Sequence, residues 1–445
     1  MLGFMTNSPS GRRPQEPFPV RGPEDILAFI PHSLGFVPRN SLVLMTVDTV
    51  RLGATLRLDL PASALDYSDF AAKVCEILRT DLSADGVLMA LYTDRAWKRP
   101  DVPPYRRLVS ALGQCLADAG MPIRDGWVVS AAAWREYFCV DGSCCPWPGH
   151  PLGDISASTL SAEMVYRGSA YAPSLGEAVD MDLPPRWADA SDAAAHCAAY
   201  ARRLKGRWCG YEQFEDTLRI WDWFISAAAA DARSLPGAEP GCPRVRAHPE
   251  AAGFLLASLH ARPVRDTLLV MAALGLKQAL TGAADCNLLS ADGKPPLVPP
   301  GFGPAGAVEN AGGPGGGPLQ QRSDSAAQTF RDVLVGQYLR APQWRGMDAA
   351  FSVFAELLAA AAADQCADRE ATAALLSLLA WIEWARGRGS RAQVYLVRCL
   401  AAYPGYRLAQ LLEELLATGL FPLWARSAGT AWKGSSEQHP GGART

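Results

Sequence analysis

Residues 31–61, PHSLGFVPRNSLVLMTVDTVRLGATLRLDLP, constrain the fold of this chain more than any other stretch. Residues 41–47 form an apolar, β-prone run, Asp48 and Thr49 suit a turn, and residues 50–60 have the pattern of a second strand. Because side chains alternate between the two faces of a strand, the second run places its leucines on one face and its charged residues on the other. These residues therefore predict a β-hairpin with one face on a core and one charged face.

The sequence around this hairpin alternates between helical and strand patterns. Pro23 opens a short helix that Pro31 is expected to end, because proline inside a helix removes a backbone hydrogen bond. The periodicity of apolar residues predicts further helices over 67–82, 105–119 and 158–167, and strands over 86–92, 126–132 and 134–140. This order of elements predicts an α/β N-terminal domain with a mixed sheet and helices packed on it.

From about residue 188 the apolar periodicity is helical throughout, which predicts an all-α region. The expected helices cover 193–204, 211–232, 249–260, 264–280, 371–386, 390–402 and 406–417. Part of the last three resembles one tetratricopeptide-type helical hairpin. The residues that carry this resemblance are a small contact pair, a turn glycine, two close-packing positions and a terminating proline: Leu379-Ala380, Gly387, Ala392, Cys399 and Pro404.

Shifts in composition predict six segments along the chain. Polar or Gly/Pro-rich stretches cannot bury enough apolar surface to fold, so they are expected to be tails or linkers. The predicted segments are a disordered tail (1–22), the α/β domain (23–175), a helical region (176–281), a flexible Gly/Pro-rich insert (282–325), a helical tetratricopeptide-like region (326–426) and a second disordered tail (427–445).

Charge and hydropathy limit the classes of partner. The net charge is −3 and no basic stripe is visible, so no nucleic-acid partner is expected. No apolar run reaches membrane-spanning length, and the first residues lack the apolar core of a secretory signal. The 11 cysteines are an odd number and mostly scattered over predicted helices, which suits a reducing compartment. We therefore expect a cytoplasmic protein that does not bind membranes.

The segment 139–150, CVDGSCCPWPGH, is the strongest chemical candidate. Cys139, Cys144, Cys145 and His150 are four potential ligands for a tetrahedral structural zinc ion. Their spacing is not a standard one, and adjacent cysteines bind one ion only if the chain curls. The alternatives are a β-turn with the cysteines as small packing residues, or a redox pair formed by Cys139 and Cys144. Apart from this possible zinc ion, no cofactor is expected.

A second candidate site lies at the predicted hairpin. His32, Arg39, Arg57 and Asp59 would bind a small ligand in a cleft there, with His32 as a potential general base. The competing interpretation is that Arg57 and Asp59 form an ordinary solvated ion pair on an edge strand. No residue near His32 in the sequence is available to orient its imidazole.

Three short segments, LGFVPRNSLVL, RLDLP and CVDGSCCP, together resemble the signature of a domain-of-unknown-function family found in actinobacterial proteins. The resemblance extends over about residues 23–422 and is interrupted by the Gly/Pro-rich insert. This resemblance implies no activity, substrate or catalytic residues, because none is established for the family. The catalytic residues are thus unknown, and the sequence leaves open whether the protein is an enzyme.

Two functions fit these observations. The first is a non-enzymatic protein-interaction or regulatory protein that binds a protein partner through its C-terminal helices. It is favoured because the sequence contains no Walker, Rossmann, zincin or nucleophile-elbow pattern. The alternative is a small-ligand-binding protein or enzyme with a cleft at residues 31–61, beside a zinc ion bound by the cysteines.

Overall fold

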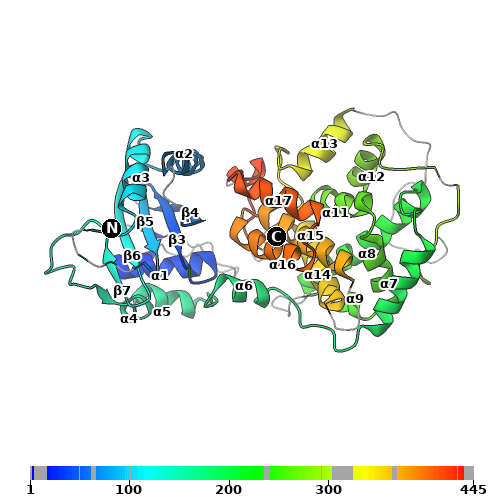
Figure 1. The fold of residues 1–445 in the computed structure, drawn as a ribbon, viewed down its shortest axis with the longest axis horizontal. Helices are drawn as coiled ribbons and strands as arrows, with labels where there is room; N and C mark the ends of the chain where they lie inside the picture. The colour runs from blue at the N-terminus through cyan, green and yellow to red at the C-terminus, as the bar shows by residue number, and fades with distance from the viewer. Residues whose placement is uncertain are drawn as a thin grey trace, which may run out of the picture. The chain divides into compact units, whose positions relative to one another are not determined.

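A computed structural model describes residues 3–4, 18–49, 51–61, 67–95, 97, 99, 102–234, 241–291, 293–302, 324–362, 368–427 and 429–434. The chain divides into two compact units, the first ending at Ala178 and the second beginning at Val179. Unit 1 contains strands and helices, whereas the described part of unit 2 is built of helices (Figure 1). The predicted order, an α/β domain followed by an all-α region, is confirmed. Of the predicted tails, residues 3–4, 18–22, 427 and 429–434 are described, and of the predicted insert, residues 282–291, 293–302 and 324–325. The rest of these three segments lies outside the described residues.

Unit 1 is organised around a six-stranded sheet in the order β4-β3-β5-β6-β7-β8. The strands are β3 (Ser41–Val47), β4 (Leu52–Asp59), β5 (Gly86–Tyr92), β6 (Ile123–Val129), β7 (Ala133–Glu136) and β8 (His150–Pro151). Only the β5–β6 pair is parallel, so the sheet is mixed, as predicted. A separate two-stranded sheet pairs β1 (Gly3–Phe4) with β2 (Phe18–Pro19).

Helices cover both faces of this sheet, which explains why β3 and β5 are buried at every position. On one face, helix α1 (Pro23–Leu34) packs Ile26, Leu27 and Ile30 against strand residues such as Val43 and Trp127. On the other, α2 (Tyr67–Leu78) packs against α3 (Arg106–Asp118) (Figure 1). Two short helices, α4 (Gly153–Ser156) and α5 (Thr159–Tyr166), complete the α1 side.

The hairpin formed by β3 and β4 is the predicted one, but one of its side chains departs from the expected pattern. Arg57 lies opposite Val43, a residue of the α1-side core, and its side chain is only 9 % exposed. Strand β4 is at the edge of the sheet, and Leu56 is its buried residue. The charged face of β4 is therefore partly covered and does not lie entirely in solvent.

The prediction that Pro31 ends the first helix is wrong. Helix α1 continues through Pro31 to Leu34 and ends at Gly35, whose φ of 79° is left-handed and whose N–H donates to the Pro31 carbonyl. Proline forfeits one hydrogen bond, but Pro31 is buried beside Ile30, and this packing favours continuation. His32 consequently lies in the last turn of a helix and not in the approach to the hairpin.

Helix α6 (Leu175–Met181) leads from unit 1 into unit 2. The helices of unit 2 are α7 (Ser191–Arg203), α8 (Tyr211–Ser234), α9 (Pro243–Arg246), α10 (Pro249–Ser258), α11 (Arg262–Leu274), α12 (Leu276–Asp285), α13 (Asp324–Leu334), α14 (Trp344–Ala361), α15 (Arg369–Ala385), α16 (Gly389–Ala402), α17 (Arg407–Ala417) and the 3-10 helix η1 (Leu423–Arg426). No described helix is both long and apolar enough to cross a membrane.

One predicted helix of unit 2 is in fact two. Residues 264–280 were expected to form a single helix, but α11 ends and α12 begins around Gly275. Gly275 has a φ of 90°, which side-chain-bearing residues rarely adopt, so the backbone turns there. The hairpin of α15 and α16 has the predicted limits within about two residues, and its expected close-packing residues, Ala392 and Cys399, are fully buried.

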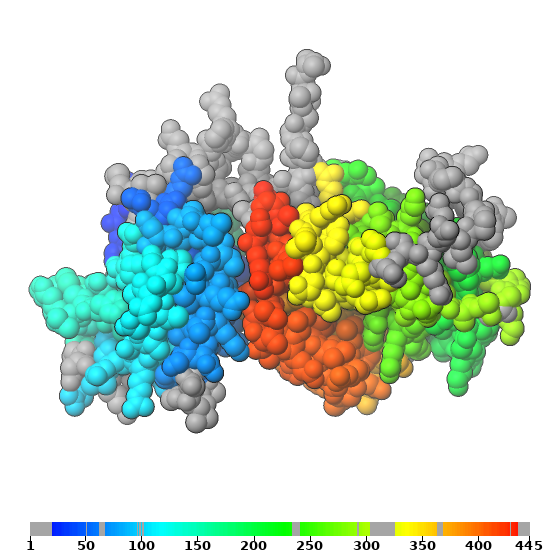
Figure 2. Space-filling view, turned by 90° about the horizontal axis from the view of Figure 1, so that it is seen from above, coloured from blue at the N-terminus to red at the C-terminus, as the bar shows by residue number. Residues whose placement is uncertain are grey.

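Segments distant in sequence meet beside this hairpin. Figure 2 shows the C-terminal residues, in red, against the chain around α13, in yellow. The N–H of Leu423 donates to the carbonyl of Gly336, and the indole N–H of Trp384 donates to the carbonyl of Leu420. The C-terminal residues of unit 2 are thus part of its packed body.

A group of charged side chains lies inside unit 2. Glu383, on α15, is fully buried and pairs with Arg386 at 2.6 Å and Arg388 at 3.1 Å. Arg386 also binds Asp348 of α14 at 2.6 Å, and Asp348 accepts a hydrogen bond from the indole N–H of Trp432. These ion pairs tie together two helices and the C-terminal residues, and nothing in the periodicity of the sequence predicted them.

Candidate metal centre

Cys139, Cys144 and Cys145 lie in the loop that connects β7 to β8. Strand β7 is held by β6, where Trp127 pairs with Glu136, and its other edge pairs with β8, where Trp134 lies opposite His150. The chain between Glu136 and His150 is therefore anchored at both ends on neighbouring strands. The three cysteines of the candidate site therefore lie in a loop that is fixed at both ends.

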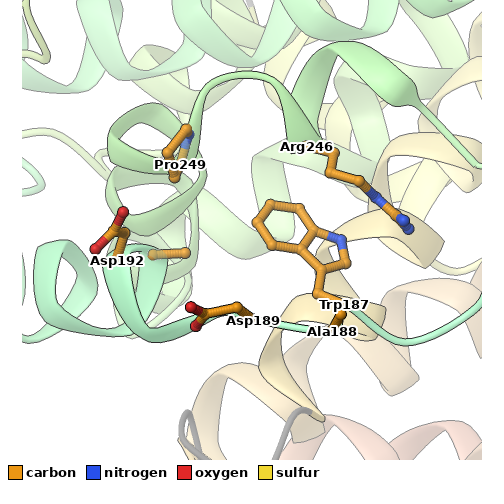
Figure 3. A pocket seen from close by; sticks show the side chains of 7 residues that line it. Trp187, Ala188, Asp189, Asp192, Arg246 and Pro249 are labelled. Carbon is orange, nitrogen blue, oxygen red and sulfur yellow. The ribbon is translucent and has the colours of Figure 1, made fainter.

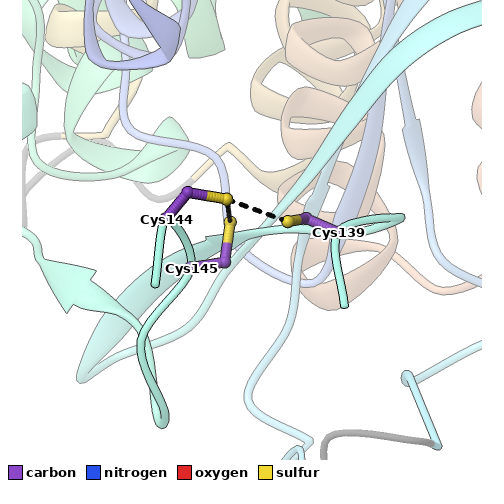
Figure 4. Close-up of side chains that lie close together, drawn as sticks. All are labelled: Cys139, Cys144 and Cys145. Carbon is purple, nitrogen blue, oxygen red and sulfur yellow. Dashed lines mark hydrogen bonds between the residues drawn. The ribbon is translucent and has the colours of Figure 1, made fainter. Parts of the chain in front are cut away.

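A local curl brings the three sulfur atoms together. The carboxylate of Asp141 accepts hydrogen bonds from the backbone N–H and the hydroxyl of Ser143, at 2.8 and 2.7 Å, and its carbonyl accepts from the N–H of Cys145 at 2.9 Å. The Sγ atoms of Cys139 and Cys144 lie 3.1 Å apart, and those of Cys144 and Cys145 lie 3.7 Å apart (Figure 4). All three sulfurs lie within 4.8 Å of one another.

Arg135 holds this loop from within the unit. Its guanidinium donates to the carbonyl oxygens of Cys145 at 2.6 Å, Pro146 at 2.8 Å and Cys139 at 3.4 Å. It also lies over the rings of Trp97 and Trp147, at 5.5 and 5.7 Å from the ring centroids. Only 3 % of Arg135 is exposed, so these hydrogen bonds replace those it would make to water.

His150 lies beside the sulfur cluster but makes other contacts. Its Nε2 lies 3.1 Å from the carbonyl oxygen of Cys144, and its ring stacks on Trp134 at a centroid distance of 4.5 Å. Glu136, which was not among the predicted ligands, also approaches the sulfurs: its Oε2 lies 3.6 Å from Sγ of Cys145. Both residues are therefore close enough to bear on the chemistry of the cluster.

The pKa values of the three thiols are shifted in different directions. Hydrogen bonds from the Cys144 and Cys145 thiols lower the pKa of Cys139, while the hydrogen bond to Cys139 raises the pKa of Cys144. Burial raises the pKa of Cys145. Burial, with a smaller contribution from Glu136, also raises the pKa of nearby Asp125 to about 6. Since a metal ion displaces thiol protons, such a cluster releases protons when it binds one.

A pocket of about 640 Å³ opens beside the sulfurs. It is bounded by the start of α1, strands β7 and β8, and the residues around the start of α5. Its lining residues are Pro23, Glu24, Trp134, Glu136, Cys144, Cys145, His150, Asp154, Ala157, Ser158 and Thr159. Three carboxylates and one imidazole line it, with no lysine or arginine in this set, so the pocket favours cations.

The four residues of the predicted hairpin site make contacts in two separate groups. Arg57 pairs with Asp59 at 2.5 Å and donates to the hydroxyl of Ser41, which donates to the carbonyl of Arg39. His32 instead contacts the hydroxyl of Ser169 at 2.9 Å and the ring of Tyr171, and burial lowers its pKa. These residues line neither this acidic pocket nor the pocket of unit 2 described next. A ligand site at the hairpin stays a prediction.

A second pocket, of about 380 Å³, lies in unit 2 and was not predicted (Figure 3). Trp187, Arg246, Asp189 and Asp192 line it together with small side chains. The indole N–H of Trp187 and the guanidinium of Arg246 both donate to Glu356, at 2.7 and 2.8 Å. The polar groups that would recognise an anion are thus already paired within the protein.

The fold and the cluster together define a two-unit protein in which a mixed α/β unit carries three convergent thiols and an all-helical unit follows. The family model described as "Domain of unknown function (DUF4192)" matches residues 23–283 and 321–423, and the chain belongs to this family. The thiol cluster lies within the first matched segment. No curated protein and no solved structure gives a significant match to the chain.

Proposed function

We propose that unit 1 is a zinc-binding domain in which the thiolates of Cys139, Cys144 and Cys145 bind one Zn²⁺. The observation that carries this proposal is the convergence of three sulfurs within 4.8 Å. With Zn–S bonds of about 2.3 Å, tetrahedral geometry separates two thiolates by roughly 3.8 Å. The distances of 3.1 and 3.7 Å require shifts of less than about 1 Å to reach that value.

Glu136 is the fourth ligand in this proposal. A carboxylate oxygen and a thiolate on the same tetrahedral zinc are separated by roughly 3.5 Å, and Oε2 of Glu136 lies 3.6 Å from Sγ of Cys145. The sequence favoured His150 for this position. Binding through His150 would require its imidazole to leave both the Cys144 carbonyl and the ring of Trp134.

The proposed zinc ion has a structural role. Three of the four ligands come from seven consecutive residues of a loop with little regular structure, and zinc contributes folding energy to such loops. The loop forms one wall of the acidic pocket, so the metal would also set the shape of that pocket. A structural ion is compatible with a non-enzymatic interaction protein.

We further propose that the C-terminal helices bind a protein partner. The observation that favours this proposal is the exposure of large apolar side chains in this part of the chain. Val397, Tyr403, Leu411 and Leu420 are all at least 39 % exposed. Replacement of Val397 and Leu411 by serine should weaken capture of that partner without changing zinc content.

Cobalt substitution of the full chain tests the zinc proposal. Co²⁺ bound by three thiolates in a tetrahedral site gives intense sulfur-to-metal charge-transfer absorption, and zinc should abolish it by displacement. Replacing Cys139, Cys144 or Cys145 by serine should reduce this absorption, whereas Cys286→Ser is the matched control, since Cys286 is a partly exposed thiol in unit 2. Unchanged spectra in all three cluster variants would refute the assignment.

A further inference from the structure

The three thiols of the cluster differ in how readily an oxidant reaches them. Cys144 is exposed and Cys139 is partly exposed, whereas Cys145 is 4 % exposed. The two accessible sulfurs lie 3.1 Å apart, whereas those of Cys144 and Cys145 lie 3.7 Å apart (Figure 4). A disulfide between Cys144 and Cys145 would close an eight-membered ring across one planar peptide bond, which adjacent cysteines form only with distortion. Geometry therefore favours one pairing.

We propose that Cys139 and Cys144 are a reversible redox pair and that their oxidation to a disulfide by a low-molecular-weight disulfide releases the zinc ion. The inference rests on the proposed metal site, because it describes how that site is regulated. The disulfide itself does not require the metal, so the two claims can fail separately.

The chemistry balances as two thiol–disulfide exchanges. The Cys139 thiolate attacks one sulfur of the reagent RSSR, which forms a mixed disulfide on Cys139 and expels RS⁻. Cys144, as a thiolate released from zinc or after losing its proton to water, attacks the Cys139 sulfur and expels the second RS⁻. Two electrons pass from the protein thiolates to RSSR, and zinc remains Zn²⁺.

Zinc leaves because the disulfide removes two of its four anionic ligands. The disulfide sulfurs no longer carry negative charge, and only Cys145 and Glu136 remain as anionic donors. The hydrogen bonds of Arg135 to the Cys139 and Cys145 carbonyls hold the loop in place throughout, which favours reversal.

The test treats the zinc-loaded full chain with glutathione disulfide in the absence of oxygen. Released zinc is measured with a chromogenic chelator, and the disulfides are assigned by mass spectrometry of peptides. We expect stoichiometric zinc release in step with a Cys139–Cys144 disulfide, and recovery of the site after dithiothreitol and added zinc. Cys286→Ser should behave like the parent chain, and Cys145→Ser should still form the same disulfide.

Three outcomes would overturn the redox pair: zinc retained at full consumption of the reagent, glutathione stably bound to Cys139 without exchange, or a different intramolecular pairing. Zinc content before oxidation separates this inference from the metal proposal. If the reduced chain binds no zinc but still forms the Cys139–Cys144 disulfide, then the metal assignment fails and the thiol pair stands.

Discussion

Arg135 is the residue on which the candidate metal centre most depends. It is buried in β7, and its guanidinium donates hydrogen bonds to the backbone carbonyls of Cys139 and Cys145, at the two ends of the loop that carries the three thiols. No side chain of similar length but without donors can replace it, because the carbonyls would be left buried and unpaired. A residue without any sulfur thus organises the sulfur cluster.

The first prediction concerns this residue. Arg135→Met should weaken zinc binding about tenfold or more, as loss of outer-shell support does at other metal sites. It should also destabilise unit 1 by about 1–3 kcal/mol through the unpaired carbonyls. Competition with a zinc chelator and denaturant unfolding measure the two effects.

Arg124→Met is the matched control for Arg135→Met. Arg124 lies on the adjacent strand β6 and pairs with Asp85 at the surface, where both side chains are more than 40 % exposed. Such a surface pair contributes less than about 1 kcal/mol. If Arg135→Met bound zinc as tightly as Arg124→Met does, the supporting role of Arg135 would be rejected.

The helices of unit 2 are held together by ion pairs as well as by apolar packing. Glu383 on α15 faces Arg386 and Arg388, and Arg391 on α16 pairs with Asp182 just after α6. Because a buried charge without its partner is costly, these pairs favour one arrangement of the helices over others. Interior charges of this kind are invisible to hydrophobic periodicity.

The second prediction removes one partner from this group. Glu383→Gln should lower the free energy of unfolding of unit 2 by about 3–5 kcal/mol, because the buried side chain of Arg386 and the partly exposed side chain of Arg388 lose the carboxylate that they share. Glu414→Gln is the control, since Glu414 forms an exposed pair with Arg407 and should change stability by less than about 1 kcal/mol. Equal stability of the two variants in urea would contradict the structural role of Glu383.

The third prediction concerns pH and the contact between α10 and α15. His260, after α10, binds the carboxylate of Asp368, the N-cap of α15, at 2.7 Å. The hydrogen bond that His260 donates to Asp368 raises the pKa of His260, while burial opposes the change and Glu370 assists it. Burial acts to raise the pKa of Asp368, but hydrogen bonds from His260, the Ala371 N–H and the Cys197 thiol lower it below its usual value.

The two pKa shifts make the stability of unit 2 depend on pH. A group with a raised pKa stabilises the fold below its unfolded pKa, and this contribution is lost as pH rises through the folded value. A carboxyl with a lowered pKa contributes above its unfolded pKa and loses the contribution as pH falls. The pair should therefore stabilise unit 2 most at weakly acidic pH and less above the raised pKa of His260. Thermal unfolding across this range should show the decline in the parent chain and a smaller one in His260→Gln.

The proposed zinc ion is bound by unit 1 and not by unit 2. Removal of zinc by a chelator should destabilise unit 1 and leave unit 2 unchanged. If zinc is present at about 100 times its dissociation constant, the loss is about 2.7 kcal/mol. Hydrogen exchange resolved by peptide measures both units in one sample. Equal loss of protection in the helices of unit 2 would contradict a role confined to unit 1.

Much of this architecture could be predicted from the sequence. Period-2 and helical patterns identified the strands, the order of elements and the change from α/β to all-α structure. The errors arose where local rules met tertiary packing: Pro31 remains in a helix because it is buried, and Gly275 bends a segment whose apolar pattern is continuous. Hydrophobic patterns predict which residues are buried, but they do not predict the backbone angles of single residues.

The thiol cluster could be predicted because three cysteines in one short segment form a recognisable pattern. Glu136 and Arg135 are close to them in sequence, but no such pattern marks them. They contact the cysteine loop because β7 and β8 pair and return the chain over the strand. The group His32, Arg39, Arg57 and Asp59 was assembled by proximity in sequence, and the helix carrying His32 directs it to Ser169 instead.

X-ray absorption at the zinc edge of the purified full chain tests whether the thiol cluster binds zinc. We expect stoichiometric zinc with three sulfur ligands at about 2.3 Å and one oxygen ligand at about 2.0 Å. Glu136→Gln should keep the three sulfurs and alter the oxygen shell, while Cys144→Ser should remove one sulfur. Zinc surrounded only by oxygen and nitrogen, or no zinc retained after dialysis, would contradict the proposal that this family member binds metal through its thiol cluster.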